Sequence, residues 1–137
     1  MEIRELEEES RRREAVPIMR QLFTDTSPDE IVEWTGDDDY HLFGGFVKGE
    51  LVGVAGVLVK HMLHHARHAW LYDLVVDESQ REQGYGTALI EFVEQWANER
   101  DCEHIALVSP LKKEEVHQYY DNRNYEKWGY VIEKDLS

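Results

Sequence analysis

The sequence predicts a mixed α/β domain, an α+β arrangement on a mixed sheet, with the element order β-α-α-β-β-β-α-β-α-β. Three apolar segments in the middle of the chain are separated by short polar turns, which is typical of antiparallel strands. A glycine-containing turn and an amphipathic helix follow the third segment, and another strand follows that helix. Because a β-α-β crossover joins parallel strands, the sheet contains both strand orientations.

The first part of the chain predicts a short strand and two helices. A charged run over residues 7–13 indicates a solvated face or the approach to a helix. Apolar residues at helical spacing then predict a helix over residues 15–23, with Pro17 in its first turn. Ser27 followed by Pro28 is a helix start signal, because serine caps the first amides and proline suits the first turn.

The second part of the chain predicts a hairpin, a crossover and a final strand. Lys48-Gly49-Glu50 indicates a tight hairpin turn, and residues 61–68 indicate a second hairpin tip. Pro110 ends the strand that follows the crossover helix. The predicted strands span residues 1–6, 40–47, 51–60, 70–76, 103–109 and 128–133, and the predicted helices span residues 15–23, 28–34, 84–100 and 112–123.

Length, charge and composition limit the possible functions. We expect a single domain over residues 1–137, which is long enough for a hydrophobic core. The formal net charge of −14 argues against nucleic-acid binding and favours cationic partners such as amines, although a salt-loving source would explain it equally well. No apolar run is long enough to span a membrane, and Cys102 is the single cysteine, so we expect a cytoplasmic protein.

The most informative motif is Arg81-x-x-Gly84-x-Gly86, which follows a strand ending at Asp77 and precedes the long helix. A helix start suits a phosphate, because its amides lack intrahelical partners and the dipole is positive there. No lysine follows Gly86 as a P-loop requires, and Leu89 stands where a dinucleotide fingerprint needs its third glycine. The motif resembles the pyrophosphate loop of the GCN5-related N-acetyltransferase (GNAT) superfamily.

This resemblance implies a GNAT-like acyl-CoA N-acyltransferase fold with acetyl-CoA as co-substrate. It also implies that the two strands flanking the crossover helix splay apart to hold pantetheine. Glu82 is unusual beside a diphosphate, since relatives often have glycine or a basic residue there. Lys113 either reaches coenzyme A or is a surface lysine at a helix start. The expected cofactor-binding residues are Leu74, Val75, Val76, Arg81, Glu82, Gln83, Gly84, Tyr85, Gly86, Thr87 and Lys113.

The resemblance extends to a general acid. Tyr119-Tyr120 matches the aromatic pair of the family, and Asn124-Tyr125 replaces the Gly-Phe that follows it; asparagine tolerates the left-handed conformation. Tyr120 then stands where the family's tyrosine protonates the leaving thiolate. The alternative is that Tyr120 is a half-buried aromatic residue that only packs against the pantetheine slot between the two splayed strands.

Asp73 is the first candidate for the general base, because it lies among apolar residues in the strand before the loop. The alternative is a strand carboxylate bonded to neighbouring backbone. His117 and Glu33 are weaker candidates. Trp34, Tyr40 and Phe43 fall where the superfamily binds acceptors, or else form part of the core.

Two further features of the sequence have both a functional and a structural interpretation. Four histidines, His61, His64, His65 and His68, suggest a metal site or a solvated loop, and we expect no metal. Cys102 follows the long helix without a neighbouring histidine, so it is a poor nucleophile candidate.

We therefore predict an acetyl-CoA-dependent N-acetyltransferase in which a primary amine, preferably a small one, attacks the thioester directly. Protein amino groups are the next choice of acceptor. The other hypotheses are a non-catalytic acyl-CoA-binding or interaction module and a zinc-binding histidine tip. A homodimer is expected by analogy with the superfamily.

Overall fold

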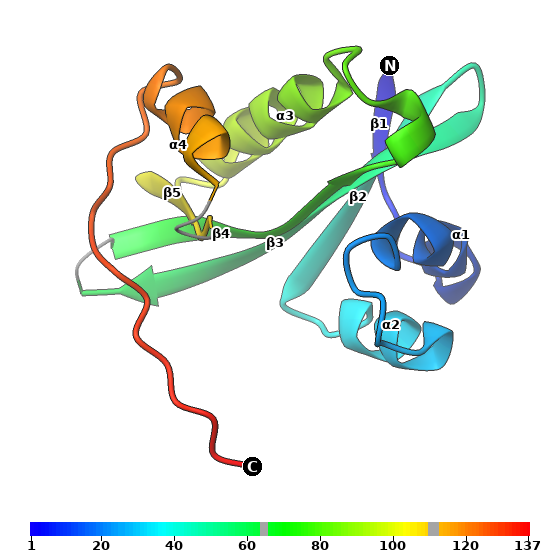
Figure 1. The fold of residues 1–137 in the computed structure, drawn as a ribbon, viewed down its shortest axis with the longest axis horizontal. Helices are drawn as coiled ribbons and strands as arrows, with labels where there is room; N and C mark the ends of the chain where they lie inside the picture. Colours follow the sequence, from blue (N-terminus) through cyan, green and yellow to red (C-terminus); the bar gives the residue numbers. More distant parts are fainter. Residues whose placement is uncertain (64–65, 110–112) are drawn as a thin grey trace. The chain divides into compact units, whose positions relative to one another are not determined.

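The computed structural model describes residues 1–63, 66–109 and 113–137, and a five-stranded sheet is its main feature (Figure 1). The strand order is β1-β2-β3-β4-β5, with antiparallel pairing from β1 to β4. The amide of Glu103 donates to the carbonyl of Arg67 at 2.7 Å, where β5 begins beside β4. The predicted mixed sheet is confirmed. The strands are β1 (Glu2–Glu5), β2 (Tyr40–Val47), β3 (Glu50–Met62), β4 (Ala66–Val76) and β5 (His104–Leu107).

The described chain divides into two compact units, residues 1–106 and residues 107–137. A single domain over the whole chain stays a prediction. None of the helices in the described ranges is long and apolar enough to cross a membrane.

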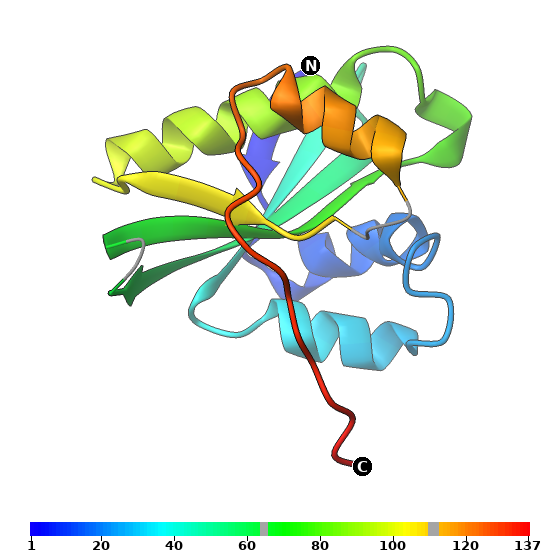
Figure 2. The same cartoon turned by 60° about the vertical axis from the view of Figure 1, so that its left-hand side comes forward.

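Helices cover both faces of the sheet in the first unit (Figures 1 and 2). The helices α1 (Glu9–Met19) and α2 (Pro28–Thr35) lie on one face, and α3 (Tyr85–Glu99) lies on the other. The face toward α1 and α2 contributes Leu42, Val54 and Val75 to a buried apolar cluster. On the α3 face, Phe43 packs edge-on against Phe92 and Trp96 of α3.

A β-bulge interrupts the pairing of β3 with β4. Gly56 pairs with Asp73, whereas the next residue, Val57, pairs with Leu71, so Tyr72 is an extra residue on β4. Side chains alternate between the two faces of a strand, so Asp73 shares its face with Val75 and points toward the α1–α2 side. The bulge lies directly beside the predicted base.

The start of the second helix agrees with the sequence, but the first helix begins earlier than predicted. The Ser27 hydroxyl accepts a hydrogen bond from the amide of Glu30 at 3.2 Å, and Pro28 occupies the first turn of α2. The helix α1 begins at Glu9, so Pro17 lies inside it rather than in its first turn. The prediction for Pro17 is wrong, because the charged run is itself helical and exposed. Burial of Val16 and Ile18 offsets the backbone hydrogen bond that proline cannot make.

The second hairpin tip is shorter than predicted. His61 belongs to β3, and His68 belongs to β4, where it pairs with Lys60. Continued strand pairing therefore replaces most of the loop expected over residues 61–68. His64 and His65 lie outside the described residues.

The second unit contains α4 (Glu114–Asp121). The final strand predicted over residues 128–133 is absent from the described residues, and residues 125–137 carry no regular secondary structure. Trp128, Tyr130 and Ile132 are 65%, 81% and 93% exposed. Alternating side chains can indicate a strand, but a strand forms only where a neighbour pairs with its backbone amides and carbonyls.

Candidate functional site

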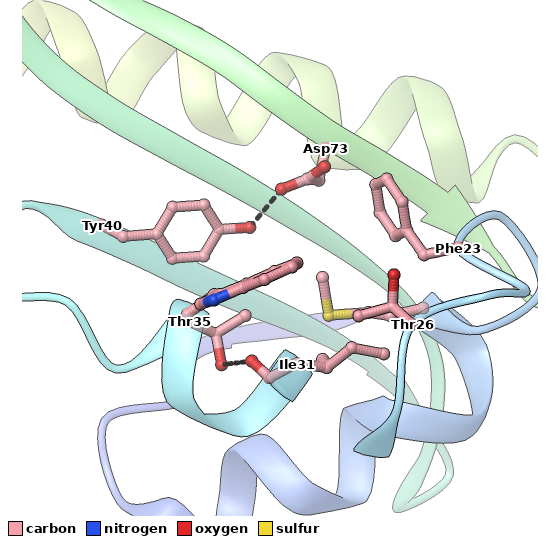
Figure 3. Close-up of a pocket in the computed structure, with 8 residues that line it drawn as sticks. Phe23, Thr26, Ile31, Thr35, Tyr40 and Asp73 are labelled. Atoms are coloured by element: carbon pink, nitrogen blue, oxygen red, sulfur yellow. Dashed lines mark hydrogen bonds between the residues drawn. The ribbon is translucent and has the colours of Figure 1, made fainter. Parts of the chain in front are cut away.

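A cavity of about 180 Å³ lies on the α1–α2 side of the sheet in the first unit. Helix α1, the connection to α2, helix α2 and strands β2 and β4 build its walls. Figure 3 shows Tyr40 and Asp73 directed toward one another, with Phe23 and Thr26 also bordering the cavity. The lining residues are Met19, Phe23, Thr26, Ile31, Trp34, Thr35, Tyr40 and Asp73.

Tyr40 and Asp73 form the polar centre of this cavity. The Tyr40 hydroxyl donates to Oδ2 of Asp73 at 2.5 Å. Within the described part of the chain, Tyr40 is the one side-chain hydrogen-bond partner that the structure gives Asp73. The pair joins β2 to β4 across the intervening strand β3. A short hydrogen bond of this kind fixes the position of one carboxylate oxygen.

Gly56 makes this hydrogen bond possible. It lies on β3 between the two partners, opposite Asp73 in the register. A Cβ atom built on Gly56 would overlap the hydroxyl and the ring of Tyr40. The absence of a side chain therefore lets the phenol lie across β3 and reach the carboxylate.

Burial determines the electrostatics of the pair. Desolvation raises the pKa of Asp73 above its usual value of 3.8, and the hydrogen bond from Tyr40 partly offsets that rise. Desolvation, the Asp73 charge and the same hydrogen bond together raise the pKa of Tyr40, so the phenol keeps its proton. The result is a carboxylate held by a neutral donor, with a higher proton affinity than an exposed aspartate.

The glycine loop leads from β4 into α3. Gly84 is the N-cap of α3 and has φ of +82°, a left-handed conformation that glycine adopts without strain. No side chain caps α3, and its first turn contains no acidic residue. A Cβ atom on Gly84 would meet no atom within 4 Å. The turn before α3 is therefore open on the side of Gly84, beside the positive end of the helix dipole.

Residues before the glycines shape the same loop. Asp77 accepts hydrogen bonds from the amide and hydroxyl of Ser79, both at 3.1 Å, which fixes the single 3-10 turn (Glu78–Gln80). Glu82 has φ of +63°, which explains why glycine would be the less strained residue there. The Glu82 side chain is exposed.

The only basic side chain of this loop is Arg81, and it supports the end of β4. Its Nε donates to the carbonyl of Val76 at 3.1 Å. Leu74 and Val76 lie on the opposite face from Asp73 and Val75, and all four pair with β3. The side chains of Gln83 and Tyr85 contact each other, with the Tyr85 hydroxyl 3.3 Å from Oε1 of Gln83. Gly86 and Thr87 form the first turn of α3.

Tyr120 lies in the second unit, on α4. Its ring packs edge-on against Tyr119 and Tyr125, with centroids 5.3 and 5.2 Å apart. Asn124 has φ of +70°, as predicted for the residue that replaces glycine in this motif. Burial raises the pKa of the Tyr120 phenol, with a further rise from Tyr119 and a smaller opposing effect from Arg123.

The other residues that the sequence singled out for the site do not line the cavity. Phe43 is a core residue on the α3 face, and Glu33 is exposed on α2 and does not line the cavity. Lys113 is exposed before α4, and His117 is half-buried within α4. Among the residues described here, no group of three or more acidic, histidine or cysteine side chains could hold a metal ion.

Sequence reasoning did not find the partnership of Tyr40 with Asp73 or the role of Gly56. The two partners are 33 residues apart in sequence. The available signal was Gly56 itself, between Ala55 and Val57 in β3, because glycine inside a strand often marks a close approach. The apolar wall formed by Met19 and Phe23 was missed because their spacing indicated an ordinary core helix.

Comparison with known proteins defines the class of protein. The model of the acetyltransferase (GNAT) family matches residues 2–130, so the chain belongs to this family. It is a GNAT-family N-acetyltransferase, as the sequence motifs predicted.

Two curated relatives are each 27% identical to this chain. One is the uncharacterized N-acetyltransferase YhdJ of Bacillus subtilis (strain 168), with 90% of this chain and 87% of that protein covered. The other is the aminoalkylphosphonate N-acetyltransferase of Salmonella typhimurium (strain LT2), with 73% of this chain and 66% of that protein covered.

Solved structures share the fold. The aminoglycoside N-acetyltransferase AAC(6')-Iy in complex with CoA superposes with a TM-score of 0.84 at 18% identity, covering 98% of this chain and 93% of that chain. The ribosomal-protein-alanine N-acetyltransferase of Brucella melitensis biovar Abortus 2308 superposes with a TM-score of 0.81 at 22% identity, covering 98% of this chain and all of that chain, 100%. The predicted GNAT-like fold is confirmed.

Proposed function

We propose that this protein transfers the acetyl group of acetyl-CoA to a primary amine, with Asp73 as the general base. The observation that carries the proposal is the Tyr40–Asp73 hydrogen bond in the cavity wall, on the strand that continues into the glycine loop. Val76 follows Asp73 by three residues, a distance of about 10 Å along a strand. The cavity and the proposed diphosphate loop therefore adjoin the same strand, so β4 can position both the amine and the coenzyme.

The geometry of the loop supports binding of the coenzyme A diphosphate. Gly84 leaves open space before α3, and no acidic side chain of the first helical turn would repel an anion. Arg81 supplies the one positive charge among the proposed loop residues 81–87. We assign the diphosphate to the amides of residues 82–87, pantetheine to the backbone of residues 74–76, and a supporting contact to Lys113.

The proposed reaction moves protons at two side chains. Asp73 takes a proton from the bound ammonium, and the nitrogen lone pair then attacks the thioester carbonyl carbon. The C–N bond forms, the C–S bond breaks, and the nitrogen loses its second proton to water as the amide forms. Protonated Asp73 then returns its proton to solvent. Tyr120 gives its proton to the leaving thiolate and is reprotonated from solvent. The raised pKa of Asp73 suits the first step, because a stronger base shares the ammonium proton more evenly.

Direct attack by the amine is preferred to a covalent enzyme intermediate. Burial raises the pKa of the Cys102 thiol, which lowers its thiolate fraction. Cys102 follows α3, and its amide donates to the carbonyl of Ala97 at 3.0 Å at the C-terminal end of that helix. Neither the raised pKa nor the position at the C-terminal end of a helix, where the dipole is negative, favours a thiolate nucleophile.

The test is thiol release from acetyl-CoA with a panel of amines, for the wild type and the variants Asp73→Asn and Tyr120→Phe. We expect Asp73→Asn to lower kcat/KM by about 100-fold or more, the usual range for a general base, while the affinity for coenzyme A is kept. Tyr120→Phe is expected to lower kcat more than it changes KM. Turnover unchanged in both variants would refute the assigned roles. A wild type that binds acetyl-CoA but acetylates no amine would instead support a non-catalytic binding module.

A further inference from the structure

The chemistry of the cavity wall defines the amine that fits it. Among the described residues that line the cavity, Asp73 is the one with a charge. The Thr35 hydroxyl already donates to the carbonyl of Ile31 at 2.7 Å, and the Tyr40 hydroxyl donates to Asp73. Thr26 adds one further hydroxyl, and the rest of the wall is largely apolar, formed by Met19, Phe23, Ile31 and Trp34.

The volume of the cavity limits the size of the acceptor. At about 180 Å³ it slightly exceeds an engineered protein cavity of roughly 150 Å³ that binds benzene. A chain or ring of similar size to benzene, together with one amino group, therefore fills it. Trp34 lies at the rim with 61% of its surface exposed, so an apolar chain leaving the cavity would cover this indole.

We infer that the acceptor is a small primary monoamine with an apolar chain or ring, bound with its ammonium group at Asp73. This inference rests on the proposed function and narrows it. A second ammonium group inside the cavity would lack a carboxylate partner and would lie against apolar side chains, which is less favourable than contact with water. A phosphonate would meet no cationic side chain of the lining. A polyhydroxylated amino sugar would find fewer hydrogen-bond partners than it has hydroxyl groups, because most of the wall is apolar.

The inferred acceptor differs in chemistry from the acceptors for which relatives and structural neighbours are named. The aminoalkylphosphonate and aminoglycoside acetyltransferases are named for acceptors that carry phosphonate or several polar groups. The wall formed by Met19, Phe23 and Ile31 offers neither a cation nor a second carboxylate to such groups.

The experiment compares three acceptors with equal numbers of non-hydrogen atoms: hexylamine, cadaverine and 2-aminoethylphosphonate. Cadaverine replaces the terminal methyl group of hexylamine with an ammonium group. We expect kcat/KM for hexylamine to exceed that for each of the others by about 10-fold or more, in the range by which pockets discriminate small changes of substrate. An aminoglycoside and a peptide with a free N-terminus complete the panel.

Variants of Trp34 provide a second test that does not depend on removing the base. Trp34→Gln removes the apolar rim. Trp34→Glu does the same with a side chain of nearly the same size as glutamine, but adds a carboxylate. Both are expected to lower turnover of hexylamine, but only Trp34→Glu is expected to raise the cadaverine-to-hexylamine ratio. Leu22→Gln is the control, because Leu22 is 51% exposed and does not line the cavity.

Direct binding separates failure of this inference from failure of the proposed function. Each amine is titrated by calorimetry into the protein saturated with coenzyme A. Binding of hexylamine without turnover would support the acceptor class and refute the proposed function. Preference for cadaverine, the phosphonate, the aminoglycoside or the peptide would refute the acceptor class while supporting amine acetylation. Absence of binding and turnover for hexylamine would also refute the acceptor class.

Discussion

The Tyr40→Phe variant isolates the hydrogen bond that holds the proposed base. The substitution removes one hydroxyl group and keeps the ring that lies across Gly56. A hydrogen bond to a charged group contributes about 1.5–3 kcal/mol, and water can replace part of it because Asp73 is only half-buried. We therefore expect a loss of about 1–2 kcal/mol of stabilisation of the carboxylate, equivalent to a factor of about 5–30.

The pH dependence identifies the origin of this loss. The Tyr40 hydrogen bond lowers the pKa of Asp73, so its removal raises that pKa. Less of the base is then ionised at a given pH, and the acidic limb of the kcat/KM profile moves to higher pH. The assay is acetyl transfer to hexylamine, or to the best amine of the panel, measured between about pH 5 and pH 9, the range in which perturbed carboxylates and amines titrate.

A matched control and a clear contrary result complete this test. Tyr72→Phe removes a hydroxyl from the neighbouring bulge residue, which is 58% exposed and not part of the cavity lining. We expect its profile to match that of the wild type. A uniform loss of activity for Tyr40→Phe at every pH, with the acidic limb unmoved, would contradict the role of Tyr40 in tuning Asp73.

The remaining predictions concern Gly56, Gly84 and Asp73. Gly56→Ala displaces the Tyr40 phenol, so it should move the acidic limb as Tyr40→Phe does, and the double variant should be little worse than either; additive losses would speak against a shared mechanism. Gly84 and Gly49 have φ of +82° and +80° with open surroundings, so Gly84→Ala and Gly49→Ala should each lower the free energy of unfolding by about 1 kcal/mol in denaturant. Only Gly84→Ala should also weaken coenzyme A binding in calorimetry. Asp73→Asn should raise Tm at neutral pH. The pKa of Asp73 is raised in the folded state, so the protein loses stability as pH rises from the unfolded-state pKa, near 3.8, through the folded-state pKa. A lower Tm would argue that the carboxylate stabilises the fold.

Local signals in the sequence predicted much of the fold. Ser27 with Pro28 marks a helix start through a mechanism confined to neighbouring residues, and it was confirmed. The bounds of β2 also agree, since a run of apolar residues ends at a Lys-Gly turn. Asn124 adopts the left-handed conformation that its side chain tolerates. Each of these features depends on residues within one turn of the chain.

Features that depend on distant partners were missed or predicted wrongly. The final strand over residues 128–133 has the right alternation of side chains, but pairing depends on a partner that alternation does not name. The bulge at Tyr72 depends on how β3 pairs with β4, and the apolar pattern of residues 70–76 contains no sign of it. Asp73 was selected from its own strand alone, whereas its donor comes from β2. Dimer formation and cytoplasmic location stay predictions.

The polar pair in the cavity wall opposes the stability of the sheet around it. Val75 lies on the same face as Asp73 and belongs to the buried apolar cluster, so an apolar residue at position 73 would extend this cluster. The carboxylate instead carries a desolvation penalty that raises its pKa, and Tyr40 only partly offsets it. Gly56 adds a second cost, because a strand glycine provides no side chain to pack. Two unfavourable choices that meet at one hydrogen bond are in keeping with the proposed role of Asp73 as the base, since neither improves packing.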